Sequence, residues 1–427
     1  MALASHSHRT TSLSEHNSLF ILRGRFLGNV RIDPLAPMQR IGVLTGGGDV
    51  PGLNAVIKSV VYQTTDMDYE VLGIRRGWEG LTHLRQGQTL DPDYVRLLDR
   101  NNTRGIDRTG GTILHTSRTN PAKIRRSGLP KHLAPEKAES LRVSDQGYDL
   151  TPVVLDNIAH LGLEYLIVIG GDDTLSFAKK LDCKGVRVIG IPKTMDNDVQ
   201  GTEYCIGFST AISRAKEAIT RQRTTLGSHE RIGIFRIFGR DSGFTALYTA
   251  YVTSGRCVIP EVEFELDRLI EILLEDKRNN PSRYSFVIAS EGAVWRGLAV
   301  AEYGEADAYG HKKKVDIGHA LGEEIRQRTG EETMVSDLTY DLRSGDPDAL
   351  DQIVAITFAN VAVDLIREGA RGRLTAVRDG KYTHVPLPDA NLGARRIDVP
   401  RMYNLTRYRP HYAGRIGSPL LLSTVDS

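Results

Sequence analysis

Apolar and polar residues follow two recurring patterns along this chain, from about Gln39 onward. Short continuous apolar runs are typical of buried β-strands, and apolar residues three or four positions apart are typical of helices packed on one face. The apolar runs predict strands over residues 40–44, 71–74, 165–169, 186–191, 231–238 and 284–289. The helical spacing predicts helices over residues 52–62, 153–161, 206–226, 244–252, 266–274, 318–328 and 350–366. Strands that alternate with helices indicate a largely parallel sheet covered by helices, and therefore an α/β protein.

Three stretches depart from this alternation. Residues 1–38 are rich in Ser, His and Arg and contain only two acidic residues, Glu15 and Asp33. We expect a flexible N-terminal extension there; an organelle transit peptide is the alternative, which the poor apolar periodicity disfavours. Residues 123–150 are basic, contain proline and lack periodicity, which predicts a long surface loop. Residues 367–427 lose the alternation and carry many Arg and Tyr residues.

The composition is that of a soluble globular protein, with 427 residues, 40% hydrophobic and 25% charged, long enough for two or three core-bearing units. The formal net charge of +2 gives no sign of a nucleic-acid-binding surface. Cys183, Cys205 and Cys257 are too few and too far apart for a disulfide framework or a zinc site, which favours the reducing cytoplasm. No apolar run approaches the length of a membrane span, so we expect neither a membrane nor a nucleic-acid partner.

Two polar runs carry the candidate chemistry, and each directly follows a predicted strand. Residues 168–174 read Val-Ile-Gly-Gly-Asp-Asp-Thr, and residues 192–198 read Pro-Lys-Thr-Met-Asp-Asn-Asp. Open α/β sheets bind ligands at the carboxyl ends of their strands. Glycines let the backbone approach a phosphate closely, and the carboxylates of Asp172 and Asp173 can hold Mg²⁺, which prefers oxygen ligands and substrate phosphates. The two runs therefore predict a phosphoryl-transfer site.

Further motifs accompany these runs between Gln39 and about Ile366. They are residues 46–54 (Gly-Gly-Gly-Asp-Val-Pro-Gly-Leu-Asn), 117–121 (Ser-Arg-Thr-Asn-Pro), 239–240 (Gly-Arg), 260–264 (Pro-Glu-Val-Glu-Phe), 290–292 (Ser-Glu-Gly) and 340–343 (Tyr-Asp-Leu-Arg). In this order the set resembles the 6-phosphofructokinase family, whereas a lone Gly-Gly-Asp also occurs in lipid and NAD kinases. The resemblance implies two similar Rossmann-like, doubly wound units with mainly parallel sheets and an active site in the cleft between them.

The resemblance also implies a division of the chain. After the extension of residues 1–38, residues 39–205 would form the phosphoryl-donor unit, which binds pyrophosphate and Mg²⁺ and is interrupted by the basic loop of residues 123–150. Residues 206–344 would form the fructose-6-phosphate unit. Residues 345–427 would supply a recrossing helix and a C-terminal segment rich in Arg and Tyr.

The phosphoryl donor divides the family, and two positions bear on it. Members that use pyrophosphate have Asp at the position of Asp173 and Lys at the position of Lys193, whereas ATP-using members usually have Gly at the first. A carboxylate at position 173 would occupy the space of ATP's α-phosphate, and a compact ammonium suits a small, highly charged anion. Arg75 also replaces the adenine-stacking Tyr of short ATP enzymes. The chain thus resembles the Mg²⁺-dependent, reversible pyrophosphate:fructose-6-phosphate 1-phosphotransferases of glycolysis and gluconeogenesis.

Each candidate residue takes a role from this resemblance. Asp196 is the expected general base for the sugar's 1-hydroxyl, and Asp172 is the expected Mg²⁺ ligand, while Asp173 could also cap the helix that begins near Thr174. The catalytic set is Asp196, Asp173, Lys193, Thr194 and Arg240. The donor-binding set is Gly48, Gly171, Arg118 and Lys193. The set that binds the sugar phosphate is Thr194, Asp196, Arg231, Phe238, Gly239, Arg240, Glu291, Tyr340 and Arg343.

Two further positions bear on assembly and on sugar choice. Arg231 matches an arginine that in this family reaches the 6-phosphate bound by a neighbouring subunit, which implies a homodimer or homotetramer. Met334 stands where many members have a second 6-phosphate arginine, a role that could pass to Arg401, Arg407, Arg409 or Arg415. Weaker binding of the sugar's 6-phosphate would allow sedoheptulose 7-phosphate as a second substrate. The remaining alternatives are an ATP-dependent 6-phosphofructokinase and a non-catalytic regulatory homologue.

Overall fold

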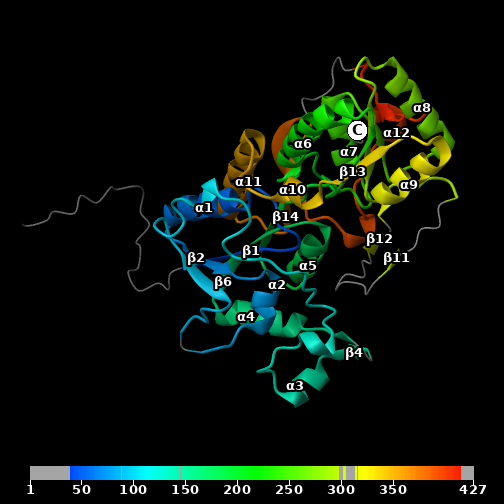
Figure 1. The fold of residues 1–427 in the computed structure, drawn as a ribbon. Coiled ribbons are helices and arrows are strands. Elements are labelled where there is room, and N and C mark those ends of the chain that lie inside the picture. Colours follow the sequence, from blue (N-terminus) through cyan, green and yellow to red (C-terminus); the bar gives the residue numbers. More distant parts are fainter. Residues whose placement is uncertain are drawn as a thin grey trace, which may run out of the picture. The chain divides into compact units, whose positions relative to one another are not determined.

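The computed structural model describes residues 39–414, apart from residues 88, 145–146, 298–301, 304–312 and 315. The predicted extension of residues 1–38 and Arg415 lie outside the described residues. Two β-sheets organise the rest, and helices cover both faces of each (Figure 1).

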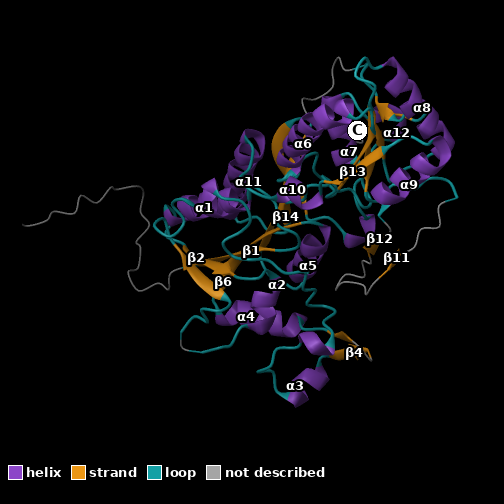
Figure 2. Ribbon diagram, in the orientation of Figure 1, coloured by secondary structure: helices purple, strands orange, loops and turns teal. Residues whose placement is uncertain are grey.

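The first sheet has seven strands in the order β15-β14-β7-β6-β1-β2-β3. Figure 2 shows the strands in orange and the helices in purple. Its five inner strands run parallel, and the two edge strands pair antiparallel. In chain order the strands are β1 (Arg40–Thr45), β2 (Glu70–Ile74), β3 (Val95–Leu98), β6 (Leu163–Gly170), β7 (Val188–Pro192), β14 (Arg373–Arg378) and β15 (Lys381–Pro386). Helices α1 (Leu53–Thr65) and α11 (Ala349–Arg367) cover one face, and α2 (Trp78–His83), α4 (Thr151–His160) and α5 (Asp172–Asp182) cover the other.

The second sheet has four parallel strands in the order β13-β8-β10-β9. They are β8 (Ile232–Ile237), β9 (Arg256–Val258), β10 (Ser285–Ser290) and β13 (Thr333–Asp337). Helices α6 (Phe208–Ser228) and α7 (Phe244–Thr253) pack on one face, and α8 (Leu266–Asn279) and α9 (Ile317–Thr329) pack on the other. The prediction of an α/β protein with mainly parallel sheets is therefore confirmed.

Short elements complete the described chain. Helices α3 (Pro135–Ser140), α10 (Thr339–Arg343) and α12 (Val399–Met402) are accompanied by the 3₁₀ turns η1 (Ile106–Arg108), η2 (Arg126–Gly128) and η3 (Ala390–Leu392). Three two-stranded ribbons pair β4 (Arg142–Ser144) with β5 (Gly147–Tyr148), β11 (Glu302–Tyr303) with β12 (Lys313–Lys314), and β16 (Tyr403–Asn404) with β17 (Arg409–Pro410).

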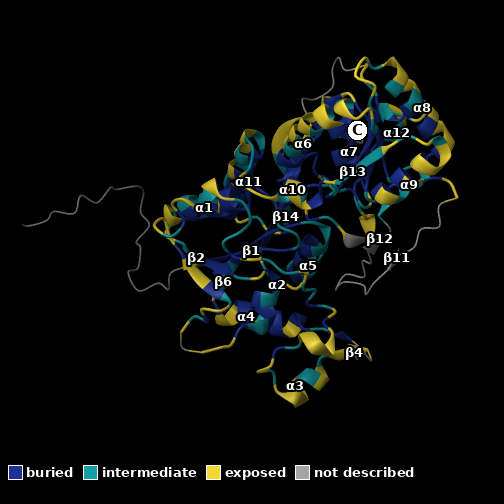
Figure 3. Cartoon of the chain, in the orientation of Figure 1, coloured by how far each residue is buried: buried dark blue, intermediate teal, exposed yellow. Residues whose placement is uncertain are grey.

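Strand β6 shows why a continuous apolar run predicts a buried strand. Successive side chains of a strand point to opposite faces of its sheet. Ile167 and Ile169 join the core on the side of α1 and α11, while Leu166 and Val168 join the core beneath α2, α4 and α5. Because helices cover both faces, every position from Tyr165 to Ile169 is apolar. Figure 3 shows the central strands as mostly buried.

Two predictions about irregular segments are wrong in part. Residues 123–150 contain α3 and the β4–β5 ribbon, held by a small apolar cluster of Ile124, Tyr148, Leu150 and Val153. Within residues 367–414, strands β14 and β15 form a hairpin that extends the first sheet beyond β7. The first sheet therefore takes strands from both ends of the described chain. The predicted division into residues 39–205, 206–344 and 345–427 stays a prediction.

Helix α11 also corrects an expectation. By length and composition it is apolar enough to cross a membrane, with a mean hydropathy of 1.6, although no apolar run was expected to approach that length. Half of it is buried, and it packs against α1, α6, β7 and β14. This is the environment of a core helix.

Candidate active site

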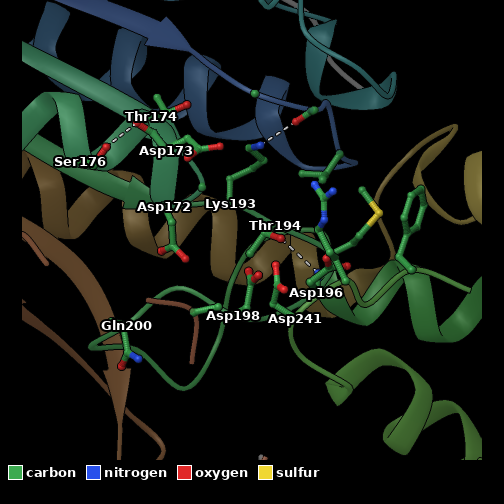
Figure 4. Close-up of a pocket in the computed structure, with 18 of the residues that line it drawn as sticks. Asp172, Asp173, Thr174, Ser176, Lys193, Thr194, Asp196, Asp198, Gln200 and Asp241 are labelled. Carbon is green, nitrogen blue, oxygen red and sulfur yellow. Dashed lines mark hydrogen bonds between the residues drawn. The ribbon is translucent and has the colours of Figure 1, made fainter. Parts of the chain in front are cut away.

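The carboxyl ends of strands from both sheets surround a cavity of about 460 Å³ (Figure 4). Gly48 comes from the turn after β1, and Asp172 comes from the first turn of α5, directly after β6. Lys193 follows β7, Arg240 follows β8 and Glu291 follows β10. The cavity thus lies at the edge of the sheets where the sequence places the ligand site.

Most of the predicted site residues meet in this cavity. Those that line it are Gly48, Arg118, Gly171, Asp172, Asp173, Lys193, Thr194, Asp196, Phe238, Arg240, Glu291 and Arg343. Their roles in catalysis and binding stay predictions.

Gly239 and Tyr340 belong to the predicted set but do not line the cavity. Gly239 shapes the turn that carries Arg240: its φ of 123° favours glycine, and a Cβ would lie 2.1 Å from Oγ of Ser290. Tyr340 is largely exposed, and the guanidinium of Arg343 lies 4.8 Å from the centre of its ring. Both residues therefore lie next to lining residues and not in the cavity itself.

Arg231 is likewise absent from the cavity. It precedes β8, at the end of the strand opposite to the cavity, and its Nε lies 2.8 Å from a carboxylate oxygen of Glu332. Met334 lies nearby on β13, where it pairs with Gly233 of β8. None of the described arginines suggested as its replacement lines the cavity, namely Arg401, Arg407 and Arg409.

The pairing of β6 with β7 brings the two predicted polar runs together. Gly170 is the register partner of Pro192, and the backbone N–H of Lys193 donates to the Gly170 carbonyl at 3.0 Å. Of the two adjacent glycines, Gly171 lines the cavity. Gly170 serves packing instead, since a Cβ there would lie 2.4 Å from the side chain of Thr174.

Asp172 and Asp173 both lie in the first turn of α5. Gly171 is the N-cap residue and no side chain caps the helix, so the prediction that Asp173 caps it is wrong. Burial, reinforced by the charges of Asp198 and Asp173, raises the pKa of Asp172 well above its usual range. The positive end of the helix dipole favours negative charge at this place. A positively charged ligand would reduce the repulsion between Asp172 and the neighbouring carboxylates, so Asp172 would bind it favourably.

Lys193 is a buried cation on the donor side of the cavity. Its Nζ donates to the carbonyl of Gly48 at 2.6 Å. Burial lowers the pKa of Lys193 to about 8, against the attraction of Asp49 and Asp198. The ammonium is therefore poorly solvated and would gain from the phosphate oxygens of a bound donor.

Asp196 has the environment of a general base. Burial, followed by the charges of Asp198, Glu291 and Asp241, raises the pKa of Asp196 well above its usual range. Among the described residues, its buried Oδ1 finds no hydrogen-bond partner, and its backbone N–H donates to Oγ1 of Thr194 at 3.1 Å. A carboxylate with a raised pKa and a free oxygen in a cavity is suited to accept a proton.

Arg343 reaches further toward the donor side than its predicted sugar-phosphate role implies. Its Nε lies 3.6 Å from a carboxylate oxygen of Asp49, and a Cβ on Gly48 would lie 3.2 Å from its Nη1. Phe238 lies on its other side, with the ring centre 6.0 Å from the guanidinium. The guanidinium of Arg343 therefore lies between the turn that follows β1 and Phe238.

The acidic side of the cavity fits a magnesium ion that is held partly by substrate. Within the described ranges, no three His, Cys, Asp or Glu side chains are close enough to hold a metal ion by themselves. Mg²⁺ is commonly bound through one or two carboxylates together with substrate phosphates. Such a charge would reduce the repulsion between the half-buried carboxylates of Asp172 and Asp198.

Several cavity residues were not predicted. Asp241 directly follows Arg240, so its place in the motif could have revealed it. Arg236 does not line the cavity but lies beside it, between the carboxylates of Asp337, at 2.6 Å, and the lining residue Glu291, at 3.7 Å; a strand residue gives no such signal in the sequence. Pro388, Asp389, Gly393 and Ala394 come from a segment without a recognisable pattern.

Comparisons with known proteins agree with this geometry. The family model described as Phosphofructokinase matches residues 40–366. The chain is 37% identical over 369 residues to the pyrophosphate–fructose 6-phosphate 1-phosphotransferase of Streptomyces coelicolor, covering 86% of this chain and 98% of that protein. It is also 37% identical over 355 residues to ATP-dependent 6-phosphofructokinase 3 of the same organism, covering 82% and 94%. Overall sequence identity therefore does not distinguish a pyrophosphate-dependent from an ATP-dependent enzyme.

The fold is shared more widely. The crystal structure of the pyrophosphate-dependent phosphofructokinase from Marinobacter aquaeolei matches with a TM-score of 0.67 at 17% identity, over 91% of this chain and 92% of that one. At this identity the likeness establishes the fold alone. The family match over most of the chain, the close relatives and the arrangement of the cavity show together that this protein belongs to the phosphofructokinase family.

Proposed function

We propose that the protein transfers a phosphoryl group from pyrophosphate to the 1-hydroxyl of fructose 6-phosphate, giving fructose 1,6-bisphosphate and phosphate in a reversible, Mg²⁺-dependent step of glycolysis. The observation that carries the choice of donor is the presence of Asp173 and Lys193 in one cavity. The named relatives include enzymes of both donors, so these local side chains decide between them.

The two residues favour a short donor for different reasons. Lys193 supplies a buried positive charge beside the turn of Gly48, where a small anion can satisfy it. Asp173 adds a negative charge in the first turn of α5. Pyrophosphate ends where ATP continues, so a carboxylate beyond its second phosphorus excludes the longer donor by clash and repulsion at little cost to the shorter one.

The remaining side chains divide the reaction among them. Asp196 accepts the proton of the 1-hydroxyl as that oxygen attacks phosphorus, and Thr194 supports the same region by its hydroxyl. Arg118, Lys193 and Arg343 place positive charge around the donor, which offsets the charge on the transferred group. Mg²⁺, held by Asp172 with the donor's oxygens, would neutralise further phosphate charge.

Two features support related proposals about the whole protein. Arg231 lies at the far end of β8 from its own chain's cavity, which supports a homo-oligomer in which it completes a neighbour's site. The cysteines are free, and Cys205 and Cys257 are buried, which supports a cytoplasmic location.

The alternatives rest on weaker grounds. An ATP-dependent 6-phosphofructokinase is supported by relatives such as ATP-dependent 6-phosphofructokinase 3 of Streptomyces coelicolor. The side chain of Asp173 opposes this longer donor. Sedoheptulose 7-phosphate remains a candidate second sugar, since no arginine occupies position 334. A non-catalytic homologue has no chemical reason to keep Asp172, Asp196 and Arg240 together in one cavity.

Turnover of fructose 6-phosphate with Mg²⁺ and either pyrophosphate or ATP tests the proposal. We expect fructose 1,6-bisphosphate to form with pyrophosphate and little or none with ATP. Preference for ATP would contradict the donor, and no turnover with either would contradict the enzyme activity.

A further inference from the structure

The segment that follows β15 forms one wall of the cavity. Pro388, Asp389, Gly393 and Ala394 line it, and the turn η3 contacts α5, whose first turn carries Asp172. This wall lies beyond residue 366, where the family match ends. The motifs of the family therefore assign no role to it.

Arg395, at the end of this wall, is buried and holds the loop that carries the proposed base. Its guanidinium donates to the carbonyl of Asn197 from Nη2 at 2.7 Å and from Nε at 3.2 Å, and from Nη2 to the carbonyl of Glu203 at 3.2 Å. Its backbone N–H donates to the carbonyl of Asp198 at 2.6 Å. One arginine thus binds the backbone carbonyls of three residues, Asn197, Asp198 and Glu203.

The loop needs such support because its backbone is unusual. Asn197 has a φ of 55°, in the left-handed region that few residues other than glycine adopt. Its side chain is buried, donates to the carbonyl of Glu203 at 2.9 Å and accepts from the N–H of Cys205 at 2.8 Å. The carboxylates on either side of it, Asp196 and Asp198, both line the cavity. The conformation of one residue therefore sets the direction of both.

The segment of residues 388–397 also makes contacts on the side of the second sheet. Glu261, in a motif to which the proposed reaction assigns no role, accepts from the N–H of Ile397 at 3.0 Å and from the N–H of Gly243 at 2.9 Å. Gly243 precedes α7, and the guanidinium of Arg395 lies 4.2 Å from the ring centre of Phe244, the first residue of that helix. Arg395 therefore connects the base loop to the neighbouring sheet.

A structural role alone explains this arginine poorly. Within the described part of the chain, its buried Nη1 has no hydrogen-bond partner and no carboxylate lies within ion-pair distance of it. Burying a charge without a close ion pair costs stability, although the carboxylates of Asp198 and Glu203 attract it from further away, and a neutral donor could bind the same carbonyls at lower cost. A charge kept at such a cost beside a reacting carboxylate points to a contribution to the reaction.

We propose that Arg395 is a positioning residue for phosphoryl transfer: it holds the backbone of Asn197 so that the carboxylates of Asp196 and Asp198 face the substrates. The proposal rests on the proposed function of Asp196 as the base. Displacement of a catalytic group by about 1 Å can cost about 100-fold in rate. Arg395 does not line the cavity, so substrate binding should change little.

Arg395→Ala tests the proposal with fructose 6-phosphate and pyrophosphate as substrates. We expect kcat to fall by about 10- to 100-fold while both KM values change by less than about threefold. Guanidinium ion added at millimolar concentration should restore part of kcat, because it can occupy the space that the side chain leaves. The matched control is Arg396→Ala, which removes the same charge from the exposed neighbouring position and should show wild-type kcat without a response to guanidinium.

Two results would overturn the proposal. One is an Arg395→Ala protein with wild-type kcat; the other is a loss of kcat that follows the loss of folded protein and is not restored by guanidinium. If the Ala variant does not fold, Arg395→Lys replaces it, since it keeps the charge and loses the fork of donors. Lowered kcat at nearly unchanged Tm would support positioning, and unchanged kcat would overturn it. A wild type that is inactive with pyrophosphate contradicts the proposed function instead.

Discussion

At the scale of single residues, like charges are held together in the cavity against their mutual repulsion. Asp196 is half-buried near Asp198, Glu291 and Asp241, and Asp172 is half-buried near Asp198 and Asp173. Such an arrangement costs stability and persists where substrate or metal charge will later compensate it. Lys193 is the corresponding buried cation on the donor side.

Asp196→Asn is expected to lower kcat by about 10²–10⁴-fold, because the amide keeps the shape but cannot accept the proton. Binding of fructose 6-phosphate, measured by calorimetry, should stay close to wild type. Asp198→Asn is the matched comparison, with the same change two positions further on, and should retain more turnover. If Asp198→Asn loses the greater share of kcat, the base is Asp198.

Local sequence could predict the residues whose role depends on their position after a strand. Asp172, Lys193 and Asp196 follow apolar runs, and sheet geometry then brings them together. Arg395 could not be found this way, because its contacts join residues nearly two hundred positions apart. The capping prediction for Asp173 failed because α5 begins at Asp172, two residues earlier than the sequence indicates.

At the scale of elements, the strongly periodic segments were predictable and the short ones were not. Helices α1, α6 and α11 lie within a few residues of their predicted ranges, since each buries a long apolar face. Strand β13 has only partly buried residues up to Ser336, so no continuous apolar run marks it. Hairpin β14–β15 joins the sheet through pairing with β7, which no local pattern encodes.

Helices α6 and α11 meet at a buried carboxylate. Asp351, in the first turn of α11, accepts hydrogen bonds from Tyr204 Oη at 2.6 Å, from Gly207 N–H at 2.8 Å, and from the N–H and hydroxyl of Thr210 at 2.8 and 2.5 Å. Burial raises the pKa of Asp351 from 3.8 to about 6, although the hydrogen bonds from Thr210 and Tyr204 oppose the shift. The junction should therefore respond to pH.

The direction follows from the raised pKa in the folded state. Its stabilising effect is complete below the unfolded pKa of about 4 and is lost as the pH rises through 6. The unfolding free energy of wild type relative to Asp351→Asn should thus fall by about 2 kcal/mol between pH 4 and pH 7. Thermal unfolding of both proteins across this range measures the difference. A difference that stays constant with pH would show that Asp351 does not titrate in this range.

At the scale of the whole molecule, the position of Arg231 predicts how subunits cooperate. The six residues of β8 span about 20 Å, so an arginine before the strand cannot reach a cavity beyond its other end. If Arg231 binds the sugar phosphate, it does so in a neighbouring subunit. A lone subunit would then be incomplete.

Complementation between two inactive variants tests this directly. Asp196→Asn subunits keep Arg231, and Arg231→Ala subunits keep Asp196, so a mixed dimer contains one complete site. After unfolding and refolding a 1:1 mixture, we expect about a quarter of wild-type activity, because half of the dimers are mixed and each has half of its sites intact. Light scattering should show a dimer or a larger assembly. A fully active monomer, or a mixture no more active than its components, would refute the shared site.

The donor preference is the central claim, and the ratio of kcat/KM for pyrophosphate to kcat/KM for ATP measures it most directly. Wild type should strongly prefer pyrophosphate, and Asp173→Gly should lower the ratio by gaining ATP use and losing pyrophosphate efficiency. Asp173→Asn, which keeps the volume and removes the charge, separates repulsion from clash. Lys193→Gly should couple with Asp173→Gly because both side chains line one donor pocket. A wild type that prefers ATP, or a ratio that Asp173→Gly leaves unchanged, would contradict the account.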